Sequence, residues 1–473
     1  MSHGGGSEGE KFLGPLREAF EHHIAEFDPF DLHSFMAWID EWGISRTLVL
    51  GLMFFSLMSI LAIEVSSSIW NSIAWMAIWL FGTAPIWLPI ALIIGAFRVW
   101  VWYAQSLYIA GRNPILLEVK MPREIMKSPR AMEIALGNFW LSSGEVTYLH
   151  RFWRGQVRPW FSLEIASFGG EIHFYIWTWK SYKNVAETAI YGQYPDVEIY
   201  EVQDYASKFV YDPAKYTLFA TDFRYDPRSD AYPIKTYIDF ELDKDPKEEL
   251  KVEPLAQVLE VLGSIRKTEQ AWIQITFRQA GKQGILSTTS SDKDWKKRVA
   301  AEVQKIRAQA TKSPVEGAKD SPFPHATWLQ TQQIQTLERH LGKLPFEVVM
   351  RGAYIADTTK GPFDGATYTA VRWIWRPFNN PGYLNGLRPA RWHNPFDYPW
   401  QDFHKMRWNL VSRRFLDAYR RRSTFYIPWN TPVNIMTTET IASIWHPPSR
   451  TVVTPGLERI PSTKSEPPPN LPT

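Results

Sequence analysis

Two long apolar stretches near the N-terminus constrain this chain more than any other feature of its sequence. Thr47–Val65 carries one charged residue, Glu64, close to its end, and Ile73–Phe97 carries none. About 19 residues at 1.5 Å per residue are just enough to cross roughly 30 Å of hydrocarbon. Tryptophans lie in and directly after the second stretch, as they do at bilayer interfaces. We therefore predict a two-helix transmembrane hairpin within residues 47–110.

A secretory signal and a buried hairpin of a soluble protein are the alternative interpretations of these stretches. A signal is disfavoured because about 45 residues precede the first stretch and a second stretch follows. The turn between them lacks Lys and Arg, whereas basic residues are frequent after Phe97. The positive-inside rule therefore predicts that both termini are cytoplasmic. The acidic arm, residues 1–46, has the apolar spacing of an amphipathic helix near the membrane surface over Pro15–Trp42.

Composition limits the chemistry that the chain can perform. Cysteine is absent, which excludes disulfides, thiolate ligands and a cysteine nucleophile. The net charge is only +3, so attraction to a polyanion would have to come from a local patch. The chain has 23 tryptophans among its many aromatic residues, which fits membrane interfaces, large contact surfaces or stacking platforms.

The region from residue 114 onward has an α+β pattern. Residues 114–215 predict the order strand, helix, strand, strand, helix, strand, which is the split βαβ or ferredoxin-like layout. Residues 216–446 predict a second, expanded unit of the same kind, with a linker near 311–324. Its expected elements are strands at 233–242, 272–277 and 346–355 and helices at 255–265, 294–308 and 330–340. A proline-rich tail, residues 447–473, is expected to be extended.

Motifs that would indicate catalysis are scarce. The sequence lacks a P-loop, a nucleophile elbow, a zinc-protease motif and a dinucleotide fingerprint. The best group of metal-capable residues, His393, Asp397, Asp402 and His404, lacks regular ligand spacing, so loop hydrogen bonding is the better interpretation. We predict no enzyme activity, no cofactor and no metal. A membrane-bound envelope enzyme that uses the 393–404 loop is one alternative.

A run of basic residues lies on a predicted helix near the C-terminus. Its spacing fits either a solvated helix face or a contact with anionic lipid or nucleic-acid phosphate. A membrane-tethered nucleic-acid-binding module is therefore a second alternative function. The candidate polyanion contacts are Arg413, Arg414, Arg420, Arg421 and Arg422.

The C-terminal sequence resembles a known group of proteins. The stretch TTETIASIWHPP, residues 437–448, is similar to the segment that precedes the ATPase module in HerA/TraG-like proteins. The stretches TPGLERI at 454–460 and PPPNLP at 467–472 resemble the end of that segment. Upstream, Asp245-Pro246 and TEQAWIQ at 268–274 resemble another part of it, with Thr268 where that group usually has Gly.

This resemblance covers most of residues 114–473 and implies a two-span membrane protein associated with type IV secretion or conjugation in candidate-phyla bacteria. The motor module would begin about where this chain stops. The implied role is a non-catalytic accessory platform in the bacterial inner membrane that docks a separate hexameric P-loop ATPase. A homo-oligomer is expected, and DNA is a further partner of such a machine. The candidate docking residues are Trp445, His446, Pro447, Pro448, Pro467, Pro468, Pro469 and Asn470.

Overall fold

The computed structural model divides into two compact units, which are described separately. One contains residues Met1–Ala96 and Phe396–Met406, and the other contains Phe97–Pro395 and Arg407–Thr473. The residues that the structure describes are 51, 53–56, 58, 68–123, 125, 127–141, 147–244, 252–281, 292–311, 326–393, 402–426, 428–450, 452, 454 and 456–460. The acidic arm, most of the first predicted span and the tail beyond Ile460 lie outside them.

The second apolar stretch forms two helices, α4 (Ser68–Gly82) and α5 (Ala84–Ala110), instead of the single one predicted. Thr83 lies between them, and its backbone N–H and its hydroxyl both donate to the carbonyl oxygen of Trp79, at 2.9 and 2.6 Å. Pro85 lacks an N–H and lies in the first turn of α5, where proline is tolerated. Among the described residues, α5 is the one helix that is long and apolar enough to cross a bilayer. The structure is therefore consistent with membrane association through α5.

The second unit contains one sheet that is antiparallel except for its terminal pair. The strand order is β10-β1-β3-β2-β6-β7-β5-β8, with β4 also paired to β1 and β9 also paired to β7. Among the paired strands of the described residues, β1 and β10 are the one parallel pair. The strands are β1 (Pro114–Pro122), β2 (Phe161–Phe168), β3 (Glu171–Trp179), β4 (Glu198–Val202), β5 (Tyr216–Asp226), β6 (Glu269–Gln279), β7 (Pro345–Asp357), β8 (Gly386–Ala390), β9 (Asn434–Thr437) and β10 (Arg459–Ile460).

The two halves of this sheet repeat one connectivity. The first half runs β1, α6, β2, β3, α7, β4 and has the order β4-β1-β3-β2. The second runs β5, α9, β6, β7, α12, β8 and has the order β8-β5-β7-β6. The halves join where β2 pairs with β6, with Ile165 opposite Ile273. Their helices are α6 (Arg130–Gly137), α7 (Lys183–Tyr191), α9 (Pro254–Gly263) and α12 (Gly365–Arg372).

Helices cover both faces of the sheet. Alternate residues such as Leu117 and Leu163 pack under α6, α7, α9 and α14 (Thr438–Ile444), in one apolar core. The opposite residues, including Trp177 and Trp272, pack under α8 (Tyr205–Lys208) and α13 (Met406–Arg420). Because side chains alternate between the faces of a strand, covering both faces buries entire strands. All 13 residues of β7 are buried.

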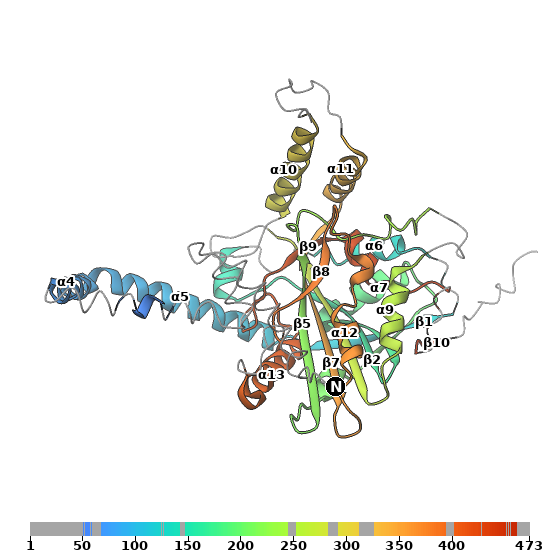
Figure 1. Ribbon diagram of the computed structural model, residues 1–473, viewed down its shortest axis with the longest axis horizontal. Helices are drawn as coiled ribbons and strands as arrows, with labels where there is room; N and C mark the ends of the chain where they lie inside the picture. The colour runs from blue at the N-terminus through green and yellow to red at the C-terminus, as the bar shows by residue number, and fades with distance from the viewer. Residues whose placement is uncertain are drawn as a thin grey trace, which may run out of the picture. The chain divides into compact units, whose positions relative to one another are not determined.

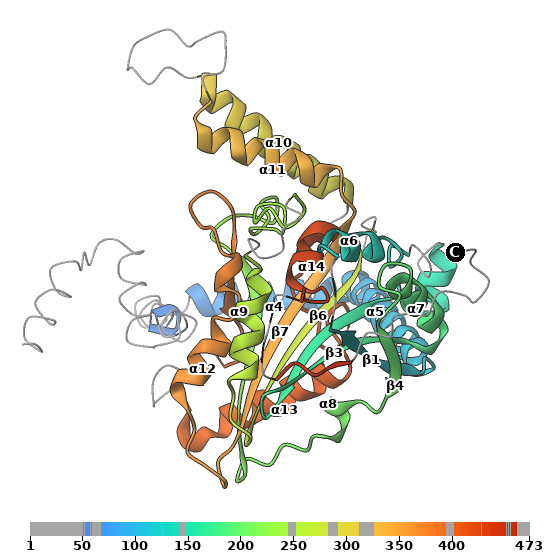
Figure 2. The same cartoon turned by 90° about the vertical axis from the view of Figure 1, so that its right-hand side faces the viewer.

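An inserted helical hairpin interrupts the second half. Helices α10 (Asp292–Thr311) and α11 (Trp328–Leu341) lie between β6 and β7 in the sequence and pack along each other. Figure 2 shows this pair projecting beyond the ends of the strands. The base of the hairpin is fixed by Trp295, whose indole N–H donates to the carbonyl oxygen of Asp230 at 2.9 Å.

Several predicted elements are confirmed and one is wrong. The predicted helices in 294–308 and 330–340 and the strands in 272–277 and 346–355 lie within α10, α11, β6 and β7. The predicted helix over 255–265 ends at Gly263. The predicted strand over 233–242 is instead a series of turns, because the Asp239 carboxylate accepts from the backbone N–H of Thr236 and stabilises a local turn. The first strand of the second half is β5 (Figure 1).

Candidate functional site

The segment that carries the resemblance is built into the core of the second unit. Thr437 ends β9 and caps α14, with its hydroxyl oxygen accepting from the backbone N–H of Thr440 at 3.4 Å. Every residue of α14 is buried. A buried carboxylate in such a helix needs compensating partners, and Glu439 is the acidic residue of this segment.

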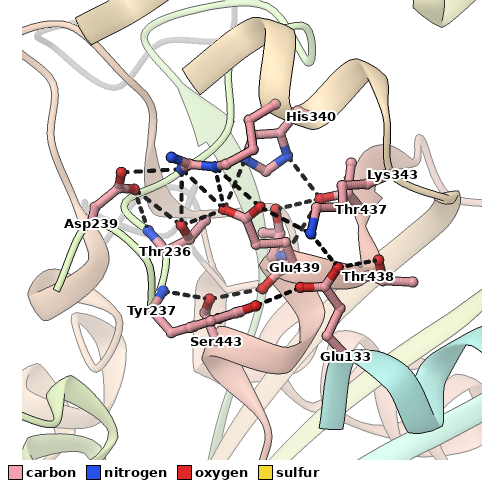
Figure 3. Close-up of polar contacts among 12 residues, drawn as sticks. Glu133, Thr236, Tyr237, Asp239, His340, Lys343, Thr437, Thr438, Glu439 and Ser443 are labelled. Atoms are coloured by element: carbon pink, nitrogen blue, oxygen red, sulfur yellow. Dashed lines mark hydrogen bonds and ion pairs between the residues drawn. The ribbon is translucent and has the colours of Figure 1, made fainter. Parts of the chain in front are cut away.

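Glu439 accepts hydrogen bonds from side chains of two other segments (Figure 3). Arg339 of α11 donates through its Nε to both carboxylate oxygens, at 3.1 and 3.2 Å. The Thr236 hydroxyl donates to Oε1 at 2.6 Å. Two further basic groups lie near: His340 Nε2 is 3.5 Å from Oε1, and Lys343 Nζ is 3.8 Å from Oε2.

These contacts set the protonation state of Glu439. Burial by itself raises the pKa of a carboxyl, but the charges and hydrogen bonds of His340 and Arg339 outweigh it and lower the pKa of Glu439 to about 2. Arg339 is held by a second carboxylate as well, because its Nη2 donates to Asp239 Oδ1 at 3.1 Å. Glu439 therefore stays ionised at any physiological pH and is unsuited to proton transfer.

A second carboxylate, Glu133 of α6, extends the cluster into the first half of the sheet. Lys343 Nζ donates to one of its oxygens and the Tyr237 hydroxyl to the other, both at 2.6 Å. Burial and the hydrogen bond to Glu133 raise the pKa of Tyr237. The Ser443 hydroxyl oxygen accepts from the backbone N–H of Tyr237 at 2.9 Å. We call this set the Glu439 network: Glu133, Thr236, Tyr237, Asp239, Arg339, His340, Lys343, Thr437, Thr438, Glu439 and Ser443.

The Glu439 network joins four segments that are distant in the sequence. It connects α6, the turns at 236–239, α11 and α14, and so couples the first half, the second half and the C-terminal segment. Its carboxylates are matched by cations and hydroxyl donors, as buried charges require. The arrangement holds segments together and presents no acid–base pair poised for catalysis.

Four of the predicted docking residues lie in the same buried segment. Trp445 is fully buried, and its ring lies 5.7 Å from that of Phe174. His446 is 2% exposed, and its ring nitrogens face the Ala442 carbonyl and the Glu253 carboxylate at 2.7 and 3.1 Å. Pro447 and Pro448 are also buried. A partner could reach these side chains only by displacing the segment, so their role here is packing. The other predicted docking residues, Pro467, Pro468, Pro469 and Asn470, lie outside the described residues.

The arginines of the predicted polyanion contact also differ in how deeply they are buried. Arg422 is fully buried and forms a bidentate pair with Glu164, with both N···O distances 2.9 Å, and it also donates to Asp204 at 2.6 Å. Burial alone would lower the pKa of Arg422, but these two carboxylates raise it well above its usual value. The Arg420 guanidinium donates to the carbonyl oxygens of Ala206 and Phe209. In this structure Arg422 is therefore buried inside the chain and Arg420 is partly buried, and both bind groups of the chain itself.

The remaining arginines of the run are exposed on α13 or directly after it. Arg413, Arg414 and Arg421 are exposed. Arg421 pairs with Asp417 at 2.7 Å, one helical turn away. Within the described part of the chain, Arg413 and Arg414 have no carboxylate partner. The predicted patch of five arginines therefore reduces to two uncompensated charges.

His393 belongs to the predicted group of metal-capable residues, but both of its ring nitrogens contact other groups of the chain. Its Nδ1 accepts from the backbone N–H of Ala220 at 2.9 Å, and its Nε2 faces the Ser412 hydroxyl at 3.1 Å and the Trp408 carbonyl at 3.2 Å. His393 is buried, and both ring nitrogens are engaged. Within the described residues, no group of three or more potential ligands is present. Asp397 lies outside those residues.

The sequence analysis did not identify most of the charged residues that pair with Glu439 and Arg422 or lie in their clusters. Glu133, Glu164, Asp204, Arg339 and Lys343 were not singled out. A usable signal was present for Glu164, which stands in an otherwise apolar strand, and for Glu439, which stands in an otherwise uncharged buried helix. A charged residue in such a position requires a partner of opposite charge, although the sequence alone does not say which one.

Comparison with known proteins assigns no family to the chain. No protein-family model matches it, and no curated protein matches it significantly.

Proposed function

We propose that this chain is a non-catalytic, membrane-anchored platform of a type IV secretion-like, conjugative translocation system. In this role it is a homo-oligomer in the bacterial inner membrane, with two spans and cytoplasmic termini, and it docks a separate hexameric P-loop ATPase. Its two halves are tandem ferredoxin-like units joined through β2 and β6. The repeated order β4-β1-β3-β2 and β8-β5-β7-β6 supports this architecture.

The observation that carries the proposal is the path of the C-terminal segment. β9 pairs with β7 in the second half, α14 contributes Glu439 to the central network, and β10 pairs with β1 at the far edge of the first half. One segment thus closes both halves into a single body. This C-terminal segment is also the part that resembles the region before HerA/TraG-like ATPase modules. A platform that carries a motor would need such a segment to be firmly built into its fold.

The site geometry favours a platform over an enzyme. The charge clusters around Glu439 and around Arg422 are each internally compensated. In such clusters removal of one partner leaves an uncompensated buried charge, so each cluster favours the arrangement of segments that keeps its partners together. Neither leaves an uncompensated carboxylate for general acid–base work.

The structure shows why a simple truncation of the C-terminal segment cannot test the proposal. A truncation at residue 447 would remove β10 and the buried Pro447 and Pro448, and would damage the fold. The informative variant replaces Pro467, Pro468 and Pro469 with Ala. Its matched control replaces Ser462, Thr463 and Ser465 with Ala, which changes the same tail without touching the proline cluster.

Tagged full-length chain would be purified from native membranes in mild detergent and its partners identified by mass spectrometry. We expect a P-loop ATPase with the unaltered chain and the Ser/Thr control, and a loss of at least tenfold with the proline variant. Equal recovery with both variants would refute the tail as the docking site. Absence of any ATPase from all samples would refute the platform proposal. Crosslinking of the same sample tests the homo-oligomer.

A further inference from the structure

A cluster of aromatic side chains lies beside α5 at the point where its uncharged part ends. A π-helical turn, η1 (Leu149–Trp153), packs along the helix. The rings of Phe97 and Phe152 are 5.4 Å apart, and those of Trp100 and Trp153 are 5.7 Å apart. The Trp100 indole also donates to the carbonyl oxygen of Phe152 at 3.1 Å. We call Phe97, Trp100, Tyr103, Tyr148, Phe152 and Trp153 the aromatic collar.

A close backbone contact fixes the collar to the helix. Gly155 follows η1 with a φ of +61°, and a Cβ at this residue would lie 2.2 Å from the carbonyl carbon and oxygen of Ala104. Only glycine allows the chain to approach the backbone of α5 so closely. The collar is therefore held at one level along α5.

The collar is apolar yet exposed. Tyr148 is 71%, Trp153 62% and Tyr103 58% exposed. Large aromatic side chains left in water forgo the stabilisation that burial would give, and clusters of them mark interaction surfaces. The exposed side of α5 next to them is apolar as well, including Trp102 and Leu107.

Basic residues border this surface. Arg98 is the first charged residue of α5 after an uncharged run from Ala84. Arg151 and Arg154 flank Trp153, and Arg151 lies 5.3 Å from the ring of Phe152. In the described part of the chain none of these three arginines is paired with a carboxylate. Aromatic rings bordered by uncompensated arginines suit the headgroup layer of an anionic bilayer, where rings lie at the interface and cations meet lipid phosphate.

We propose that the aromatic collar is a second membrane contact, which inserts into the headgroup layer of an anionic phospholipid bilayer at the end of the uncharged stretch of α4 and α5. Continuity with α5 selects a bilayer as the occupant, because the collar extends the exposed apolar surface of the one described helix able to cross a membrane. The contact fixes the depth of α5 and the orientation of the sheet unit at the membrane. This proposal rests on the membrane anchorage in the proposed function and is independent of the ATPase partner.

The absence of cysteine allows the proposal to be tested by single-site labelling. Trp153→Cys would be labelled with the environment-sensitive fluorophore NBD in the full-length chain, reconstituted in nanodiscs of phosphatidylcholine with phosphatidylglycerol. Trp328→Cys, on α11 and 73% exposed, is the control for a side chain in water. Leu92→Cys, in the apolar part of α5, is the control for a side chain in lipid. Tyr148→Cys repeats the measurement if Trp153→Cys does not fold.

We expect the label at residue 153 to emit at shorter wavelength than at residue 328 and to be quenched by lipids that carry a nitroxide at the headgroup. Replacing Arg151 and Arg154 with Gln, or phosphatidylglycerol with phosphatidylcholine, should weaken that quenching by about twofold or more. If the label at 92 reports lipid but those at 153 and 148 report water, the collar proposal is overturned and the anchorage stands. If the label at 92 also reports water, the anchorage itself fails.

Discussion

Replacing Glu439 with Gln tests whether the Glu439 network holds the fold together. The side chain keeps its shape but loses its charge, so Arg339 and Lys343 lose their shared carboxylate. The pKa of Glu439 is lowered from 4.5 to about 2 in the folded protein. At about 1.4 kcal/mol per pKa unit, ionised Glu439 contributes about 3 kcal/mol to the free energy of unfolding.

The loss of unfolding free energy caused by Glu439→Gln should depend on pH in one direction. A carboxyl whose pKa is lower in the folded state stabilises the protein above its unfolded pKa, and this stabilisation is lost as pH falls through the folded pKa. Glu439→Gln should therefore destabilise the chain by about 3 kcal/mol at pH 7. The difference from the unaltered chain should shrink as the pH falls from about 5 to about 2, because a protonated Glu439 resembles Gln.

Urea unfolding of the detergent-solubilised full-length chain, followed by tryptophan fluorescence, measures this difference. A loss of about 3 kcal/mol moves the midpoint by roughly 1 M urea or less, because the slope m increases with the size of the protein. Glu338→Gln is the matched control, because Glu338 pairs with Arg307 on the surface of the same hairpin, with both side chains about half exposed. It should change stability by less than about 1 kcal/mol. Equal midpoints for Glu439→Gln and Glu338→Gln, or a difference that does not depend on pH, would refute the reasoning.

Two further substitutions test the burial of other groups. Arg422→Gln should cost about 3–5 kcal/mol, because it leaves the buried carboxylate of Glu164 and the partly buried carboxylate of Asp204 without their cation. Arg421→Gln on the exposed side of the same run should cost less than about 1 kcal/mol. Similar urea midpoints for the two variants would contradict this. Gly456→Ala should cost about 1–3 kcal/mol, because its Cβ would lie 1.6 Å from the Gly170 carbonyl oxygen, whereas Gly361→Ala meets open space. Faster tryptic cleavage of the C-terminal segment in Gly456→Ala alone is the expected result.

Most regular elements could be predicted because their signals are local. The long uncharged run that becomes α5, and the spacing of apolar residues in α9 and α11, depend on neighbouring residues only. The sequence analysis did not predict the strand β5. This strand is held by pairing with β7 on one edge and with β8 on the other, and both partners are distant in the sequence. The strand predicted over 233–242 failed because Asp239 bonds the backbone of its own turn. In both places contacts that sequence periodicity does not record decided the outcome.

The sequence by itself determined the long apolar helix, the alternation of strands and helices, and the lack of common catalytic motifs. The tertiary structure decided which charges are on the surface. Arg421 and Arg422 are adjacent in the chain, yet one is exposed and the other is fully buried. Arg422 is buried because Glu164, 258 residues earlier, lies opposite it in the folded chain. The position of such a distant partner comes from the pairing of strands and from packing, which local sequence patterns do not specify.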